Sequence, residues 1–227
     1  MAAPKVEPKI YTAVVLDFET GGLNCVDCAC TQLAMQAVRL DNWTVLERYA
    51  KYIAPYRKLD IGGAPKRKVL KTRQALVQEE AGMSMKYEPV ALTYSAITMD
   101  MLYNQGVDLK EVAQDVIEFG KRNTLSKGQQ CKPILIGQNI TFDIGFLQQL
   151  IAYAGLMPEF EKVFAGKVDF YGNFQPHYVD TIDLGRFAFA HLPDVTSYKL
   201  EILSERLGIE SVSYTHLRAH ETPEHLV

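Results

Sequence analysis

The apolar and polar positions near the start of the chain predict three β-strands. Residues 11–18 (YTAVVLDF) form an almost unbroken apolar and β-branched run, which is typical of a buried central strand. Residues 32–38 and 44–53 alternate partially between apolar and polar side chains, and the turn-like pair at residues 41–42 separates them. We therefore expect a central strand followed by two strands that pair as a meander.

The remainder of the chain alternates between helical and extended patterns. The expected elements are a helix at 107–119, a short strand at 133–137, a helix at 144–154, a fifth strand at 177–184 and a helix from an N-cap at Ser197 to residue 207. Strands interleaved with helices in this way indicate an α/β domain.

Size and composition limit the class of protein. A chain of 227 residues that is 48% hydrophobic suits one well-buried domain with room for an insertion. No run approaches the roughly 18 apolar residues of a membrane helix, and the N-terminus lacks the core of a signal peptide. Four cysteines, three of them crowded within residues 25–30, suit a reducing compartment. We expect a cytoplasmic protein without a membrane partner, and a net charge of −3 argues against coating of nucleic acid by charge alone.

Asp17 and Glu19 lie at the end of the first predicted strand. Residues two apart on a strand point to the same face, so both carboxylates aim at one point. Two carboxylates this close stay ionised at low cost only when a cation compensates them, and oxygen ligands suit Mg²⁺ or Mn²⁺. Taken alone, such a pair more often marks an exposed strand edge or a helix cap.

A further acid, Asp143, follows a short apolar strand and opens an amphipathic helix. Alone, it is explained as a partner of the helix dipole. That explanation leaves out an ordered combination of three motifs: Asp-x-Glu-Thr-Gly-Gly-Leu from Asp17, Asn-x-x-x-Asp from Asn139, and Asp-Thr-x-x-Leu-x-Arg from Asp180. Three motifs in order are more specific than any one of them.

These residues resemble the DEDD exonucleases on the ribonuclease H-like fold, a group that includes the epsilon subunit of DNA polymerase III, PolC-type exonuclease domains and ribonuclease T. VVLDFETGGL is similar to the first motif of this family, ILIGQNITFDIGFL to the second, and the segment from residue 178 to 210 to the stretch before the third. The resemblance implies an α/β, ribonuclease H-like fold with a five-stranded mixed sheet flanked by helices.

The resemblance also implies roles for individual residues. Asp17, Glu19 and Asp143 correspond to the catalytic metal ligands. The residues expected against the substrate are Thr20, Gly21, Leu23, Asn139 and Phe142, with backbone and hydroxyl contacts from the first two and apolar contact from Leu23. Gln138 stands where many members have His, and Asp180 is expected to be structural rather than a ligand.

The implied activity is 3′→5′ hydrolysis of single-stranded DNA or RNA ends with two Mg²⁺ or Mn²⁺ ions, of a proofreading or repair type, with a DNA polymerase as a candidate partner. DNA and RNA substrates cannot be told apart from these motifs. The alternative is a non-catalytic module on the same fold that binds nucleic acid or accompanies a polymerase.

Residues 57–85 interrupt the order of strands and helices with an excess of Lys and Arg, including Lys66, Arg67 and Lys68. We expect a basic insertion on the surface. It could guide a phosphate backbone, or it could be a solvated helix or hairpin without a role in binding.

Residues 212–227 (VSYTHLRAHETPEHLV) resemble a translated sequencing adapter and are excluded from the expected domain, which covers residues 1–211. The family's last helix, which carries a general base and a fourth Asp, is therefore expected to be missing. The spacing of His216 and Glu221 is assigned to coincidence. Cys25, Cys28 and Cys30 lack the second pair of ligands that a structural zinc site needs.

Overall fold

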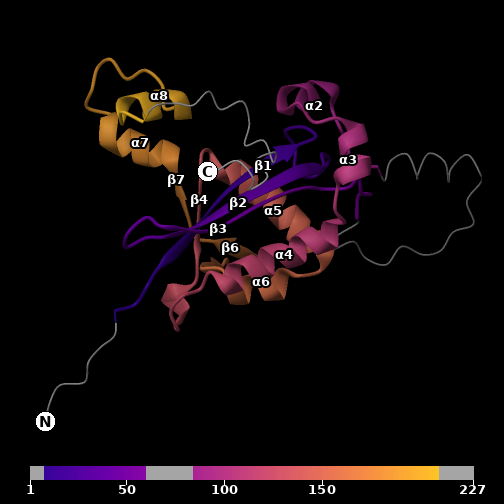
Figure 1. The fold of residues 1–227 in the computed structure, drawn as a ribbon, viewed down its shortest axis with the longest axis horizontal. Helices are drawn as coiled ribbons and strands as arrows, with labels where there is room; N and C mark the ends of the chain where they lie inside the picture. Colours follow the sequence, from indigo (N-terminus) through magenta and orange to yellow (C-terminus); the bar gives the residue numbers. More distant parts are fainter. Residues whose placement is uncertain (1–7, 60–83, 210–227) are drawn as a thin grey trace, which may run out of the picture.

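A computed structural model describes residues 8–59 and 84–209. Its main feature is a five-stranded sheet in the order β3-β2-β1-β4-β7 (Figure 1). The strands are β1 (Thr12–Thr20), β2 (Cys30–Arg39), β3 (Val45–Tyr52), β4 (Ile134–Gly137) and β7 (Tyr178–Asp180). β1 and β3 each pair with β2 in antiparallel fashion, whereas β4 pairs with β1 and β7 in parallel. The five-stranded mixed sheet and the ribonuclease H-like fold are thus confirmed.

The central position of β1 follows from its sequence. Val14, Leu16 and Phe18 are buried on one face of the strand and belong to the main core. Opposite them on β2 lie apolar partners, with Leu33 across from Phe18 and Met35 across from Leu16. The register therefore places apolar pairs of both strands against the same layer of helices.

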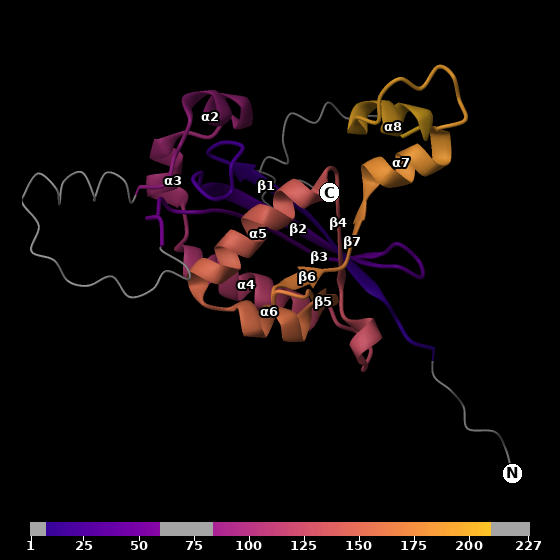
Figure 2. The same cartoon turned by 180° about the vertical axis from the view of Figure 1, so that it is seen from behind.

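That layer consists of α4 (Leu109–Arg122), α5 (Ile140–Ala154) and α6 (Met157–Val163), which lie together on one side of the sheet in Figures 1 and 2. α4 begins at the N-cap Asp108, whose side chain accepts a hydrogen bond from the Lys110 backbone N–H. Its buried stripe includes Val112, Val116 and Ile117, as its helical periodicity predicts.

Smaller elements complete the described chain. They are α2 (Pro89–Ser95), α3 (Met99–Gln105), the 3₁₀-helix η1 (Gln129–Cys131), the hairpin strands β5 (Gly166–Val168) and β6 (Phe174–Pro176), α7 (Thr181–Phe189) and α8 (Leu200–Arg206). In the described residues, no helix has the length and apolar character needed to cross a membrane.

The predicted fifth strand was wrong in its second half. The strand ends at Asp180, because this side chain accepts a hydrogen bond from the Ile182 backbone N–H and caps α7 instead. The N-cap of α8 is Lys199 rather than Ser197. The predicted helix at 144–154 begins earlier, at Ile140, so Asp143 lies within its first turn.

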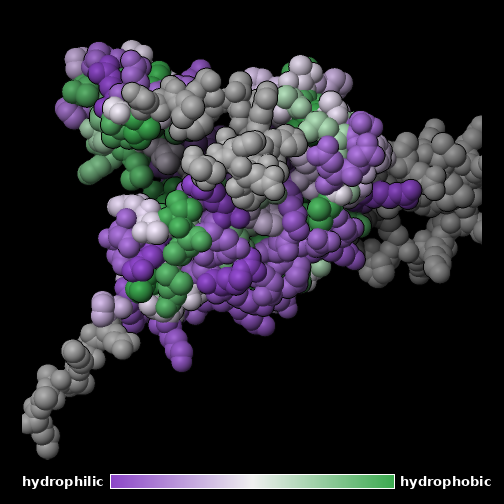
Figure 3. Space-filling view, in the orientation of Figure 1, coloured by the Kyte–Doolittle hydropathy of each residue, from purple (hydrophilic) through white to green (hydrophobic). Residues whose placement is uncertain are grey.

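The second face of the sheet differs from the one covered by α4 and α5. Val15 on β1 is 37% exposed, and Tyr178 on β7 is 46% exposed. Figure 3 shows apolar surface below α7 and α8, and Phe187 of α7 is 91% exposed. The predicted tail at residues 212–227 lies outside the described residues, so the missing last helix stays a prediction.

Most of the predicted basic insertion also lies outside the described residues, but its two ends are described. Arg57 and Ser84 form an antiparallel bridge. The two described ends of the insertion therefore lie side by side.

Candidate active site

Asp17 and Glu19 extend from the far end of β1, on the face opposite Phe18. Asp17 is exposed and Glu19 partly exposed, whereas the alternating residues Leu16 and Phe18 are buried. The register on β2 shifts directly after Glu19, between Glu19 and Thr20. The two acids thus occupy the last regular positions of the central strand.

Asp143 reaches the same strand from α5. It is only 4% exposed, and its Oδ1 accepts a hydrogen bond of 2.9 Å from the backbone N–H of Phe18. Because Phe18 lies between Asp17 and Glu19 in the chain, this bond fixes the start of α5 beside both acids.

The pKa of Asp143 reflects its burial first and the two neighbouring acids second. Burial above all, together with the negative charges of Asp17 and Glu19, raises the pKa of Asp143 from 3.8 to about 7, while the hydrogen bond from the Phe18 N–H opposes the rise. A buried carboxylate near two others is unfavourable in the ionised form. A divalent cation would remove this penalty.

The donor chemistry of this group suits a hard cation, since all three side chains offer carboxylate oxygens. Within residues 8–59 and 84–209, however, no three His, Cys, Asp or Glu side chains are arranged so that they could hold a metal ion as they stand. The acids are gathered at one place, and binding of a cation would require their side chains to adjust.

The loop after β1 carries the first group of predicted substrate residues. Leu23 is 85% exposed, so its side chain is available for an apolar contact. Gly21 already donates its backbone N–H to the Ala29 carbonyl and accepts at its own carbonyl from the Glu88 N–H. The Thr20 hydroxyl donates to the Gly22 carbonyl at 2.8 Å. These backbone and hydroxyl groups, which were expected to touch substrate, therefore already form hydrogen bonds within the protein.

Gly21 is required by packing. A Cβ at this position would lie 2.4 Å from the carbonyl oxygen of Lys86, which is backbone and cannot move aside independently.

Asn139 and Phe142 lie at the start of α5. Asn139 is exposed, has a left-handed backbone with φ of 54°, and donates its N–H to Asp180 at 3.1 Å. Phe142 is half-buried, with its ring 5.0 Å from that of Phe146. Both therefore lie just before Asp143 in the chain and share its end of the sheet.

Gln138 and Asp180 make structural contacts around this turn. Gln138 donates from Nε2 to the Tyr198 carbonyl at 2.9 Å and accepts from the Thr181 hydroxyl. Asp180 accepts from the backbone N–H groups of Asn139 and Ile182. These two side chains join the start of α5 to the α7–α8 region.

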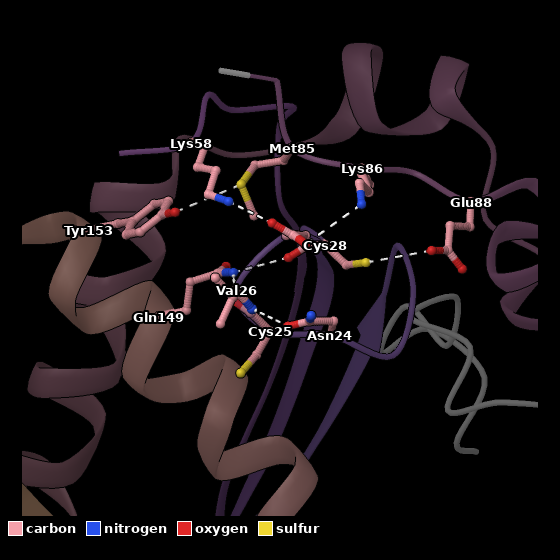
Figure 4. Close-up of polar contacts among 11 residues, drawn as sticks. Asn24, Cys25, Val26, Cys28, Lys58, Met85, Lys86, Glu88, Gln149 and Tyr153 are labelled. Atoms are coloured by element: carbon pink, nitrogen blue, oxygen red, sulfur yellow. Dashed lines mark hydrogen bonds and ion pairs between the residues drawn. The ribbon is translucent and has the colours of Figure 1, made fainter. Parts of the chain in front are cut away.

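Sequence reasoning missed the residue that holds the loop after β1. Gln149 of α5 is 8% exposed and donates from Nε2 to the carbonyls of Cys25 and Cys28 (Figure 4). Its Oε1 accepts from the Tyr56 hydroxyl at 2.6 Å. Two of these hydrogen bonds, the one to Cys28 buried and the one to Cys25 partly buried, thus connect this loop to the helix bearing Asp143.

Two further contacts hold the loop after β1, one from Lys86 before α2 and one from Lys58 after β3. Lys86 donates its backbone N–H to the Asp27 carbonyl, and the Lys58 ammonium forms an ion pair of 2.5 Å with the Asp27 carboxylate (Figure 4). Hydrogen bonding from Lys58 lowers the pKa of Asp27. The chain at the start of the predicted basic insertion and the chain directly after it are thereby both joined to the loop after β1.

The crowded cysteines are part of the same packing. Cys28 and Cys30 are buried and free, and burial raises the pKa of the Cys30 thiol to about 12. The Cys28 Sγ lies 3.9 Å from the Glu88 carboxylate.

No family model matches the sequence. Known structures do match. Exonuclease I of E. coli in complex with a dT13 oligonucleotide superposes with a TM-score of 0.57 and 18% identity, over 88% of this chain and 36% of that one. The chain shares its fold with exonuclease I. A zinc-bound form of the E. coli enzyme with single-stranded DNA gives a TM-score of 0.57 and 19% identity, over 90% of this chain and 37% of the other. The chain therefore spans less than half the length of these structures.

Proposed function

We propose that this protein is a metal-dependent 3′→5′ exonuclease that acts on single-stranded nucleic acid. The observation that carries the proposal is the buried Asp143, hydrogen-bonded to Phe18 between two acids of the central strand. Its raised pKa supports a site suited to a cation. The shared fold adds support, since the matched exonuclease I structures contain single-stranded DNA and, in one case, zinc.

In this proposal Asp17, Glu19 and Asp143 hold two Mg²⁺ or Mn²⁺ ions. When bound, such ions supply an activated water and stabilise the leaving 3′ oxygen. The Phe18 N–H fixes the Asp143 carboxylate in position, and Gln149 fixes the loop that presents Leu23 to the terminal nucleotide.

The decisive experiment is made on the protein completed beyond residue 211, and it compares Asp17→Ala with Asp100→Ala, an exposed acid in the first turn of α3. Asp17→Ala should reduce Mn²⁺-dependent shortening of a 5′-labelled single strand by about 1000-fold, as removal of one preorganised group does in other active sites. Asp100→Ala should leave the rate unchanged. Equal rates for Asp17→Ala and the unchanged protein would refute the proposal.

A non-catalytic binding module is the second candidate, because the described residues form no closed metal site. It predicts binding of single strands that is indifferent to Mn²⁺. The exonuclease proposal predicts tighter binding with Mn²⁺ and a preference for a free 3′ end over a blocked one. DNA and RNA strands of equal sequence, tested side by side, would decide the sugar preference. A polymerase partner and a cytoplasmic location stay predictions.

We further propose that residues 212–227 are adapter-derived and that the natural chain continues differently after residue 211. Sequencing the source gene from unfragmented DNA tests this. A frame that continues into a helix with His-x-x-x-x-Asp or Tyr-x-x-x-Asp supplies the general base, and activity should then be measured on that product. A frame that encodes VSYTHLRAHETPEHLV contradicts the proposal.

A further inference from the structure

A group of lysines surrounds a hollow on a part of the molecule that the proposed reaction does not use. The hollow has a volume of about 690 Å³, and Lys121, Lys127, Lys132 and Lys162 line it. They come from the end of α4, the loop between α4 and β4, and α6. This loop lies at the lower left in Figure 1.

The hollow and the carboxylates lie at opposite ends of the sheet. β1 and β4 run in parallel, with Ala13 beside Ile134. Asp17 and Glu19 lie near the C-terminal end of β1, whereas Lys132 lies just before the N-terminal end of β4. The lysines therefore belong to a separate site.

The positive charge in the hollow is only partly balanced. Lys121 pairs with Glu118 at 2.8 Å. The Lys132 ammonium donates to the Glu161 backbone carbonyl at 2.8 Å, and its partial burial lowers its pKa, while the negative charge of Glu161 partly opposes this. In the part of the chain that the structure describes, Lys127 and Lys162 form no ion pair. Clustered like charges repel one another, so an anion in the hollow would be favoured.

The other lining groups indicate which anion. Among the described residues that line the hollow there is no carboxylate and no aromatic ring, so there is nothing on which a base would stack. Ser126 accepts from the Ile10 N–H at 2.8 Å, which leaves its hydroxyl hydrogen for a ligand. Gln129 adds an amide donor. Ammonium, hydroxyl and amide donors together suit phosphate oxygens.

We propose that this lysine hollow is a phosphate-binding site. It holds the phosphate groups of a free phosphate compound or of a nucleic-acid backbone, through Lys127 and Lys162 above all. The proposal does not depend on the exonuclease activity, because the hollow and the three acids lie at opposite ends of the sheet.

The test uses calorimetric titration of the whole chain with pyrophosphate. The double variant Lys127→Gln/Lys162→Gln is compared with Lys110→Gln/Lys199→Gln, which removes two lysines elsewhere and changes the net charge equally. The first pair of changes should weaken pyrophosphate binding at least about tenfold, which corresponds to about 1.4 kcal/mol. The control double variant should bind pyrophosphate as tightly as the unchanged protein does. Added salt should weaken pyrophosphate binding by the control variant and by the unchanged protein.

Two further probes identify the source of the phosphate. A single-stranded oligonucleotide whose affinity falls in the first double variant indicates the nucleic-acid backbone, whereas an unchanged affinity indicates a free phosphate compound. Pyrophosphate binding that is equal in all three proteins overturns the proposal. So does a polyglutamate peptide that binds the hollow more tightly than pyrophosphate, since the site would then favour carboxylates.

Discussion

The two ends of the sheet carry opposite charge and are built in different ways. At one end, the carboxylate group of Asp17, Glu19 and Asp143 includes a buried acid and adjoins a loop held by buried hydrogen bonds. At the other end, the lysine hollow is formed by side chains at the surface. A phosphate is repelled by the first end until a cation is bound, but is attracted by the second directly. The overall charge of −3 conceals this division.

The largest expected effect comes from the carboxylate end: without metal, Asp143 should make the free energy of unfolding depend on pH. The raised pKa of Asp143 means that the folded protein holds a proton that the unfolded chain releases at lower pH. The stabilising contribution of Asp143 to the free energy of unfolding is therefore fully present below about pH 4, and it is lost as the pH rises to about 7. The difference between 3.8 and about 7 corresponds to about 4 kcal/mol.

Asp143→Asn should remove this loss, since the amide oxygen still accepts from the Phe18 N–H without carrying charge. Urea unfolding with a chelator should show the variant more stable than the unchanged protein near pH 8 and similar near pH 4. Mn²⁺ should stabilise the unchanged protein and not the variant. Asp100→Asn serves as the exposed control. A difference between variant and unchanged protein that stays constant with pH would contradict the assignment.

The next comparison concerns the side-chain amides at the two ends of the sheet, Gln149 at the loop after β1 and Gln129 at the lysine hollow. Gln149→Leu should lower the free energy of unfolding by about 2 to 4 kcal/mol, because the carbonyls of Cys25 and Cys28 and the hydroxyl hydrogen of Tyr56 lose the partner that Gln149 gives them. Gln129→Leu at the rim of the lysine hollow removes an exposed amide and should cost less than about 0.5 kcal/mol. Similar costs in denaturant titrations would show that the loop after β1 is not held by Gln149.

The sequence predicted the strands of the main sheet and the long helices better than the short elements of the fold. β1 and α4 have enough residues for their apolar periodicity to identify them. α2, α3 and α6 have seven residues each, about two turns, so no periodic stripe could be recognised. The apolar residues after Tyr178 fit both a strand and a helix, which is why the predicted fifth strand runs into α7.

The candidate site divides in a similar way. Asp17, Glu19 and Asp143 could be proposed because ordered motifs mark them, and the structure brings them to one end of the sheet. Gln149 could not be found, since its partners are backbone carbonyls in a loop more than 100 residues away, as the separations of 124 and 121 residues indicate. The lysine hollow likewise joins Lys162 to residues of another element, and only folding reveals the group.

The smallest expected effect is at Leu23, the one predicted substrate side chain that is almost fully exposed. Leu23→Ala should leave the free energy of unfolding within about 0.5 kcal/mol, because little apolar area is buried there. It should weaken Mn²⁺-dependent binding of a single-stranded 3′ end by several-fold, which corresponds to about 1 kcal/mol of apolar burial against the nucleotide. Leu184→Ala, a 54% exposed leucine of α7, is the matched control and should not change this affinity. Because Thr20 and Gly21 use their polar groups within the loop, Leu23 is the side chain of this loop with most surface left for the nucleotide. If both leucine variants bind the 3′ end equally well, the terminal nucleotide lies elsewhere, and the loop serves only to hold the carboxylate end together.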